Sequence, residues 1–216
     1  MGKAPRAAIV SFVGQKGGVG KSALARLLAV GAAHRGRKVL LADFDLEQLT
    51  CVEWNALRLR GGIEPEIDAR AMKSLKKLRN ADHAADFIVA DTRGLADDLT
   101  KDIAEESDVV FLPTGASGDD LRPTLALARK LAKRGAEGRL VLVLSKVGHS
   151  ERLSEKAVAL IEEAGFEALA AHWPQRDGFQ ADLDAGRAGR EARHPALRAA
   201  AMKVEEAMMA RVKARM

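Results

Sequence analysis

The sequence of 216 residues contains one cysteine, Cys51. A single cysteine excludes an internal disulfide and a four-cysteine metal site within one chain. Aromatic residues are also scarce, at 4% of the sequence, so alanine, leucine and valine must supply most of the core. Apolar residues reach 47% in all, which is enough for one sizeable core in a chain of this length.

No N-terminal segment has the pattern of a signal peptide, and no run approaches the ~18 apolar residues of a membrane-spanning helix. The sequence also lacks internal repeats and long linkers rich in glycine, serine or proline. These absences favour a soluble cytoplasmic protein with a single domain over residues 1–216.

Short apolar runs alternate with longer segments of helical periodicity. The predicted strands are 7–13, 38–43, 63–67, 86–91, 108–112, 139–145 and a weaker one at 167–172. The predicted helices are 21–35, 49–59, 70–81, 97–106, 119–134, 151–164 and 196–214. This alternation predicts an α/β protein with a mostly parallel, twisted sheet of about seven strands and helices on both faces.

The segment 14–23 is rich in glycine and is the most informative part of the chain. It lies between the apolar run 7–13 and the predicted helix 21–35, the context that a phosphate-binding loop requires. Glycines allow successive backbone N–H groups to face one anion, and the positive end of the helix faces the same point. Lys21 is then expected to reach the β- and γ-phosphates, and the Ser22 hydroxyl to bind Mg²⁺.

The run Lys16-Gly17-Gly18-Val19-Gly20-Lys21-Ser22 has an additional lysine near its start, and Gln15 replaces the first glycine of the usual motif. It resembles the deviant Walker A motif of the ParA/MinD family of ATPases. The resemblance implies a three-layer P-loop NTPase fold and an ATP-bound homodimer in which Lys16 contacts the phosphates of the partner's ATP. A triphosphate buried between subunits needs such additional positive charge. The alternative is a Lys16 side chain that lies in solvent.

Three aspartates follow two apolar strands. Asp43 ends the run 38–43, Asp45 follows two residues later, and Asp91 ends the run 86–91. Because ligands bind at the carboxyl ends of parallel strands, these carboxylates are expected to converge on the phosphates. Taken singly, each aspartate could instead be the N-cap of a helix.

The resemblance gives these residues roles. Asp91 corresponds to the Walker B residue of the Mg²⁺ shell, Asp43 supports that shell together with Ser22, and Asp45 positions the attacking water. The catalytic set is Lys16, Lys21 and Asp45. The residues implied to bind the phosphates are Gln15, Lys16, Gly17, Gly18, Val19, Gly20, Lys21, Ser22, Ala23 and Gly94.

The sequence departs from the family in three places. Leu46-Glu47-Gln48 replaces the Pro-Gln that often follows the paired aspartates, and Ala23 replaces a frequent hydroxyl residue, so one α-phosphate contact is left to backbone N–H. Arg93 stands where a small residue or proline is common, and could stabilise charge internally or pair with Asp91 or Asp97. We therefore expect Mg²⁺-dependent ATP hydrolysis that is slow until a partner completes the site.

Two later segments are candidates for the base and ribose pocket. Lys146 follows the strand 139–145, and Pro174 and Arg176 follow the next predicted strand. The segment up to Gly186 is similar to the C-terminal part of short plasmid-type ParA proteins.

The C-terminal segment from residue 187 is basic, with eight basic and three acidic residues. Such a surface can hold DNA through phosphate contacts, without reading sequence and with strong salt dependence. The alternative is a solvated helix face. The basic candidates are Arg187, Arg190, Arg193, Arg198, Lys203, Arg211, Lys213 and Arg215.

The last predicted helix carries an apolar stripe at helical spacing: Leu197, Ala201, Val204, Met208 and Val212. MinD-type relatives end in an amphipathic membrane-targeting helix, but this stripe lacks Trp, Phe and Ile. Glu205 and Glu206 would in addition repel anionic lipid. We therefore expect the stripe to pack inside the protein, and we do not expect a membrane partner.

The resemblance implies a ParA-type ATPase that binds ATP and Mg²⁺, associates with the nucleoid and partitions a plasmid, chromosome or protein cargo. A cargo- or centromere-binding adaptor would stimulate its hydrolysis. Only six residues precede the first predicted strand, so no N-terminal helix-turn-helix domain is expected in this chain. The alternative is a MinD-like placement ATPase acting on a membrane or protein complex. A metabolic reductase of the superfamily would need at least two cysteines per chain for a shared iron–sulfur cluster.

Overall fold

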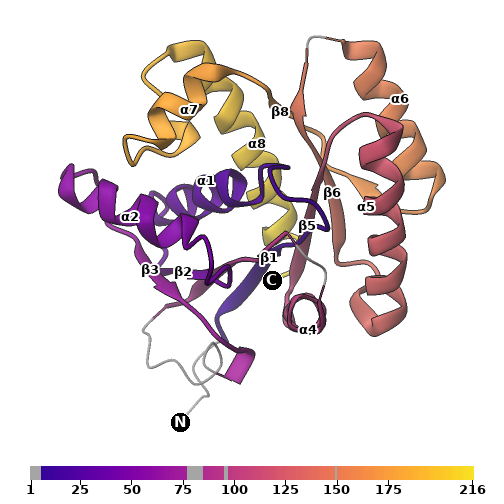
Figure 1. Ribbon diagram of the computed structural model, residues 1–216, viewed down its shortest axis with the longest axis horizontal. Coiled ribbons are helices and arrows are strands. Elements are labelled where there is room, and N and C mark those ends of the chain that lie inside the picture. The colour runs from indigo at the N-terminus through magenta and orange to yellow at the C-terminus, as the bar shows by residue number, and fades with distance from the viewer. Residues whose placement is uncertain (1–5, 77–84, 95–96, 149) are drawn as a thin grey trace.

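The computed structural model describes residues 6–76, 85–94, 97–148 and 150–216. Its centre is a sheet in the order β3-β2-β4-β1-β5-β6-β7, with β8 paired to β6, and every pairing between described strands is parallel (Figure 1). The strands are β1 (Ala8–Phe12), β2 (Val39–Asp43), β3 (Asp68–Ala71), β4 (Phe87–Asp91), β5 (Val109–Thr114), β6 (Leu140–Val147), β7 (Glu167–Ala168) and β8 (Trp173–Pro174).

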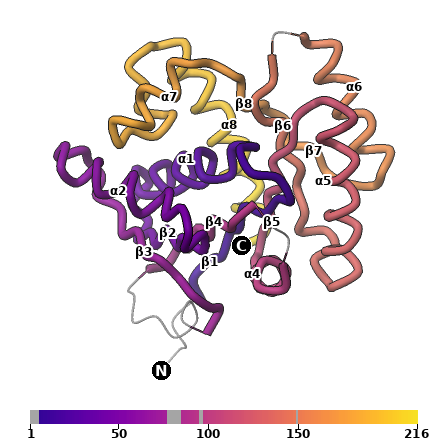
Figure 2. The backbone as a smooth tube through the Cα atoms, viewed as in Figure 1, coloured from indigo at the N-terminus to yellow at the C-terminus, as the bar shows by residue number. Residues whose placement is uncertain are grey.

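Helices cover both faces of this sheet, and the tube in Figure 2 shows the chain alternating between sheet and helix. The α-helices are α1 (Lys21–Ala33), α2 (Thr50–Arg60), α4 (Asp98–Glu106), α5 (Gly118–Leu131), α6 (Glu151–Glu163), α7 (Asp177–Leu183) and α8 (Pro195–Lys213). A π-helical turn, η1 (Ala132–Ala136), extends α5, and a 3-10 turn, η2 (Gly189–Glu191), precedes α8.

The strands alternate their side chains between two apolar cores, which explains the three layers. On β1, Val10 and Phe12 pack with α1 and α8, whereas Ile9 packs on the opposite face, where α4 supplies Ile103. On β5, Val110 and Leu112 pack with α5 and α6 on that opposite face. The predicted α/β fold with helices on both faces is therefore confirmed.

The third predicted strand, at 63–67, is wrong. β3 begins at Asp68, directly after the predicted strand ends, and pairs with β2 from Leu40 to Asp43. β3 lies at the edge of the sheet and its residues are exposed or half-buried, so it lacks the apolar run that marks the central strands. The predicted helix 70–81 is wrong at its start, because Ala71 still belongs to β3, and residues 77–81 lie outside the described part of the chain.

The region after α6 also differs from the prediction. The weak strand expected at 167–172 is reduced to β7, and β8 joins β6 further along the chain. No helix was predicted at α7, which has only seven residues and contains Gly178 in its first turn. Short helices of this kind depend on tertiary packing, here through the buried Phe179 stacked on Trp173 with ring centroids 4.3 Å apart.

The apolar stripe of α8 packs inside the protein, as predicted. Ala201, Val204, Met208 and Val212 are buried in the core shared with α1, and Leu197 packs against it. Among the described helices, none is both long enough and apolar enough to cross a membrane. One supporting argument was wrong, however, because Glu205 faces the interior and is only 1% exposed.

Glu205 is neutralised by two arginines. Arg190 Nη1 donates to both carboxylate oxygens of Glu205, at 2.7 and 2.9 Å, and Arg35 at the end of α1 donates to one of them. Gly31 on α1 leaves room for the carboxylate, because a Cβ there would overlap Glu205. This ion-pair cluster therefore fixes α8 against α1, the helix that follows the candidate phosphate loop.

Arg190→Met should lower the free energy of unfolding by about 2 to 4 kcal/mol, because it leaves a buried carboxylate with one cation instead of two. Arg198→Met is the matched control: Arg198 is exposed on α8, and its loss should cost less than about 0.5 kcal/mol. Urea denaturation followed by circular dichroism measures both. Equal losses in the two variants would contradict the role assigned to Arg190.

Candidate functional site

The predicted phosphate loop connects the buried strand β1 to α1, as expected from its sequence. Gly18 and Gly20 have φ angles of 74° and 94°, in the region that favours glycine. At Gly20 there is a second constraint, since an added Cβ would come within 2.5 Å of Ser145 Oγ on β6. The loop conformation therefore requires glycine at this position both for its backbone and for its contact with β6.

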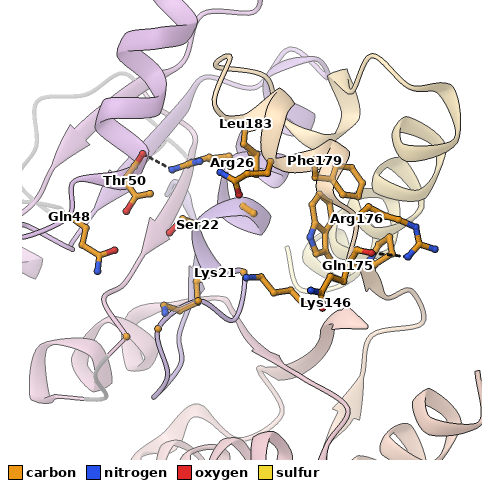
Figure 3. Close-up of a pocket in the computed structure, with 18 of the residues that line it drawn as sticks. Lys21, Ser22, Arg26, Gln48, Thr50, Lys146, Gln175, Arg176, Phe179 and Leu183 are labelled. Carbon is orange, nitrogen blue, oxygen red and sulfur yellow. Dashed lines mark hydrogen bonds between the residues drawn. The ribbon is translucent and has the colours of Figure 1, made fainter. Parts of the chain in front are cut away.

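A cavity of about 510 Å³ opens above this loop (Figure 3). Its walls come from the loop and α1, from the segments after β2 and β4, and from the segment between β6 and α7. The predicted residues that line it are Gly17, Gly18, Gly20, Lys21, Ser22, Ala23, Asp45, Gly94, Lys146, Pro174 and Arg176. The structure therefore brings together residues that lie up to about 160 positions apart in the sequence.

Asp91 ends β4 directly beneath the loop and is 2% exposed. Burial raises the pKa of its carboxyl to about 6, although hydrogen bonds from Ser22 and Cys51 favour the charged form. Oδ2 accepts a hydrogen bond from Cys51 Sγ at 3.2 Å, whereas Oδ1 has no partner among the described residues. Asp91 is thus a buried carboxylate just outside the cavity lining, with one oxygen that lacks a hydrogen-bond partner among the described residues.

Asp43 lies beside Asp91 in the register of β2 and β4, but its oxygens are already occupied. Oδ1 accepts from the backbone N–H of Asp45 at 3.0 Å, and Oδ2 accepts from Cys51 N at 2.8 Å and Val52 N at 3.3 Å. Burial raises the pKa of Asp43, and these backbone donors oppose the shift. The geometry thus gives Asp43 a capping contact, the alternative considered for each aspartate: Oδ2 holds the first turn of α2, and Oδ1 holds the backbone at Asp45.

The two lysines of the loop differ in environment. Lys21 is buried, and its Nζ donates to the carbonyl oxygen of Lys16 at 3.2 Å. Desolvation lowers the pKa of Lys21, and the nearby carboxylates of Asp91 and Asp45 oppose that change. Lys16 lies on the outside of the loop, where its Nζ contacts Asp120 Oδ1 at 2.9 Å and the carbonyl oxygen of Asp119 at 2.8 Å. Lys21 therefore faces into the site, and Lys16 faces outward.

Two further residues border the cavity from the segments that follow β2 and β4. Asp45 is half-buried, and its Oδ1 accepts from Gln48 N at 3.1 Å. Gly94 approaches the loop so closely that a Cβ there would lie 2.8 Å from Gly17 N. Arg93 pairs with Asp97, one of the two partners considered from the sequence, and does not point into the cavity lining.

Lys146, Pro174 and Arg176, the candidates for the base and ribose pocket, line the same cavity, and we call their side of it the base-side wall. Lys146 has a φ of 56°, which is uncommon for a residue with a side chain, and lies where the pairing of β6 with β8 is irregular. Trp173, Gln175 and Asp177, which flank Pro174 and Arg176 in the segment 173–177, also line the cavity. The lining residues that were not predicted are Arg26, Gln48, Thr50, Thr92, Phe179, Gln180 and Leu183, because none of them belongs to a recognisable motif.

Part of the basic C-terminal set is engaged inside the molecule. Arg190 pairs with Glu205, Arg193 Nε donates to Asp182 at 2.9 Å, and Arg211 Nε donates to Glu167 at 2.6 Å. Arg187 is half-buried. The candidates that are exposed and form no ion pair within the described part of the chain are Arg198, Lys203, Lys213 and Arg215.

The residues around Asp91 fit a divalent cation that is shared with a bound phosphate group. The Ser22 hydroxyl and the free Oδ1 of Asp91 are hard oxygen donors at the start of α1. No group of three or more His, Cys, Asp or Glu side chains in metal-binding arrangement occurs in the described part of the chain. Such sparse protein ligation suits Mg²⁺, which keeps waters and binds substrate phosphates, rather than a metal held by protein alone.

Comparison with known proteins agrees with this geometry. The profile of one family, described as the CobQ/CobB/MinD/ParA nucleotide binding domain, matches residues 10–184. A ParA protein of Rhizobium radiobacter is 26% identical over 105 residues, which cover 49% of this chain and 47% of that protein. The chain thus matches about half the length of this curated relative.

Two solved structures share the fold. MinD of Pyrococcus horikoshii complexed with Mg-ADP has a TM-score of 0.75 at 20% identity, covering 97% of this chain and 100% of that one. A protein of Borrelia burgdorferi assigned to plasmid partition, bound to AMPPNP, has a TM-score of 0.73 at 16% identity, covering 95% and 99%. At these identities the likeness extends to the fold alone.

Asp91→Asn should change how stability depends on pH. A carboxyl whose folded-state pKa of about 6 exceeds its ordinary 3.8 binds its proton more tightly in the folded protein. This tighter proton binding adds on the order of 3 kcal/mol to the free energy of unfolding. The contribution is fully present below pH 3.8 and is lost as the pH rises through about 6.

The measurement is urea denaturation at pH 5 and pH 7, without Mg²⁺ or nucleotide. Asp91→Asn should gain stability relative to wild type at the higher pH. Asp98→Asn is the control, because Asp98 is exposed beside Lys101. An unchanged difference between Asp91→Asn and wild type at the two pH values would contradict the shifted pKa.

Proposed function

Because the chain belongs to the CobQ/CobB/MinD/ParA nucleotide-binding family, we propose that it is a ParA-type ATPase that positions a cargo. It would act as a single domain that binds ATP and Mg²⁺, dimerises, and binds DNA without sequence preference. The observation that carries the proposal is the arrangement of the two loop lysines. Lys21 faces the cavity, and Lys16 is exposed beside it, where it can reach a second subunit.

The proposed roles follow the geometry of the cavity. The loop N–H groups and Lys21 hold the β- and γ-phosphates, and Ser22 with Asp91 Oδ1 holds Mg²⁺. Bound Mg²⁺ would neutralise charge between the phosphates. Asp45 lies in the cavity wall and would position the attacking water, whereas Gly94 would donate its N–H to the γ-phosphate. Asp43 acts indirectly, by fixing the loop that carries Asp45.

Lys16 is not strongly held in the monomer. Its ion pair with Asp120 is exposed, with side-chain accessibilities of 46% and 34%, and such pairs contribute about 0–1 kcal/mol. A contact with a triphosphate buried in a dimer would be considerably stronger. The lysine can therefore leave Asp120 when an ATP-bound partner approaches.

The DNA-binding part rests on the exposed basic residues of α8 and its end. Arg198, Lys203, Lys213 and Arg215 have charge free to meet phosphates. A dimer would double this charge, so affinity would depend on ATP through dimerisation. A cytoplasmic, nucleoid-associated location and an adaptor that stimulates hydrolysis belong to the same proposal.

The MinD-like alternative is favoured by one observation. Arg190, Arg193 and Arg211 are used in internal ion pairs, which reduces the charge available for DNA. In that case the same ATP-dependent dimer would act on a protein complex or membrane.

Non-specific duplex DNA should bind tightly only in the presence of ATP and Mg²⁺, and fluorescence anisotropy at 50 and 200 mM salt measures this. Affinity should fall steeply at the higher salt, because phosphate contacts release counterions. Lys16→Ala should abolish ATP-dependent binding. Asp45→Ala should slow hydrolysis roughly 10²-fold or more and prolong residence on DNA.

Lys130→Ala is the matched control, since Lys130 is an exposed lysine on α5 away from the cavity lining. Analytical ultracentrifugation separates the remaining outcomes. Dimers that form with ATP but never bind DNA would favour the MinD-like function. Absence of nucleotide binding by the wild-type protein would overturn both.

A further inference from the structure

Arg26 lies on α1 one helical turn after Ala23, and both residues line the cavity. Residues three positions apart share a helix face, and long side chains lean toward the N-terminal end of their helix. The guanidinium of Arg26 is therefore directed toward the beginning of α1. Figure 3 shows it extending beside Ser22 toward Thr50.

The surroundings of Arg26 hold the guanidinium but do not satisfy it. The residue is only 7% exposed. Its Nη2 donates to the carbonyl oxygen of Thr50 at 2.5 Å, and its Cζ lies 5.4 Å from the centroid of the Trp54 ring. Its Nε is buried and has no acceptor among the described residues. A buried donor without an acceptor costs about 1–3 kcal/mol, so the local fold does not account for this arginine.

The charge distribution of the cavity indicates what Arg26 would meet. In the proposed function Lys21 serves the β- and γ-phosphates, and Ser22 serves Mg²⁺. Ala23, at the same end of α1, lines the cavity together with Arg26 and has no side-chain donor. The remaining cations of the described lining, Lys146 and Arg176, are exposed on the opposite, base-side wall.

We propose that Arg26 is a further phosphate-binding residue, which donates to a non-bridging oxygen of the α-phosphate of a nucleoside di- or triphosphate. The proposal rests on nucleotide binding in this cavity, as argued above. A small adjustment of the guanidinium would give its unsatisfied donor an acceptor. A planar guanidinium with five N–H donors can do this while it keeps the bond to Thr50.

The test is to measure the affinities of the full chain for Mg-ATP and Mg-ADP by isothermal titration calorimetry. Arg26→Gln should weaken both by the same factor, on the order of 10- to 100-fold, because the α-phosphate is common to the two ligands. Arg26→Lys keeps the positive charge but loses the planar set of guanidinium N–H donors, and should weaken the affinities for both nucleotides by a smaller factor. Ala23→Thr in the Arg26→Gln background should restore part of the loss by supplying a hydroxyl at the same helix end.

Arg60→Gln is the matched control, because Arg60 is exposed at the end of α2 and should leave both affinities unchanged. Circular dichroism establishes whether each variant is folded. If Arg26→Gln is not folded, the test rests on Arg26→Lys. Unchanged affinities in a folded Arg26 variant would overturn the proposal. A loss for ATP without a loss for ADP would overturn the α-phosphate assignment. If wild type itself binds neither nucleotide, the proposed function fails before Arg26 is tested.

Discussion

The parallel register of β1, β2 and β4 is the constraint on which the site depends. It places Asp43 opposite Asp91, and Asp91 opposite Phe12 at the end of β1, from which the phosphate loop departs. Two carboxylates are thereby buried side by side, which is costly unless donors surround them. The fold supplies those donors to Asp43 from the backbone at the beginning of α2, and leaves one buried oxygen of Asp91 without a donor among the described residues.

This difference in hydrogen bonding between Asp43 and Asp91 gives the two aspartates different roles, which the sequence does not distinguish. Both aspartates end apolar strands, and both were candidates for the Mg²⁺ shell. Asp43 accepts backbone hydrogen bonds on both oxygens and links β2 to α2. Asp91 is satisfied only in part, by the thiol of Cys51 and the hydroxyl of Ser22. Burial raises the pKa of Asp91, and in the proposed function a cation beside it would favour the ionised carboxylate.

Much of the fold was predictable because its central elements carry their own signals. The core strands are continuous apolar runs, and the loop between β1 and α1 carries a motif whose geometry is set by glycine. The edge strand β3 and the short helix α7 were missed for a common reason. β3 depends on pairing with β2, and α7 depends on packing of Phe179 against Trp173, so neither composition nor periodicity marks them. Phe179, Gln180 and Leu183, which α7 brings to the cavity, were missed with it.

The availability of charged side chains for ligands was the least predictable property, because the number of basic residues does not reveal which of them form ion pairs within the protein. The C-terminal excess of basic residues is real, yet Arg190 serves a buried Glu205 and so belongs to the packing of α8. Arg26 is the opposite case: nothing in its sequence context distinguishes it from a solvated helix arginine, but it is buried with an unsatisfied donor beside the cavity. A buried arginine that the fold does not need marks a ligand more reliably than an exposed cluster does, since solvent already satisfies the cluster.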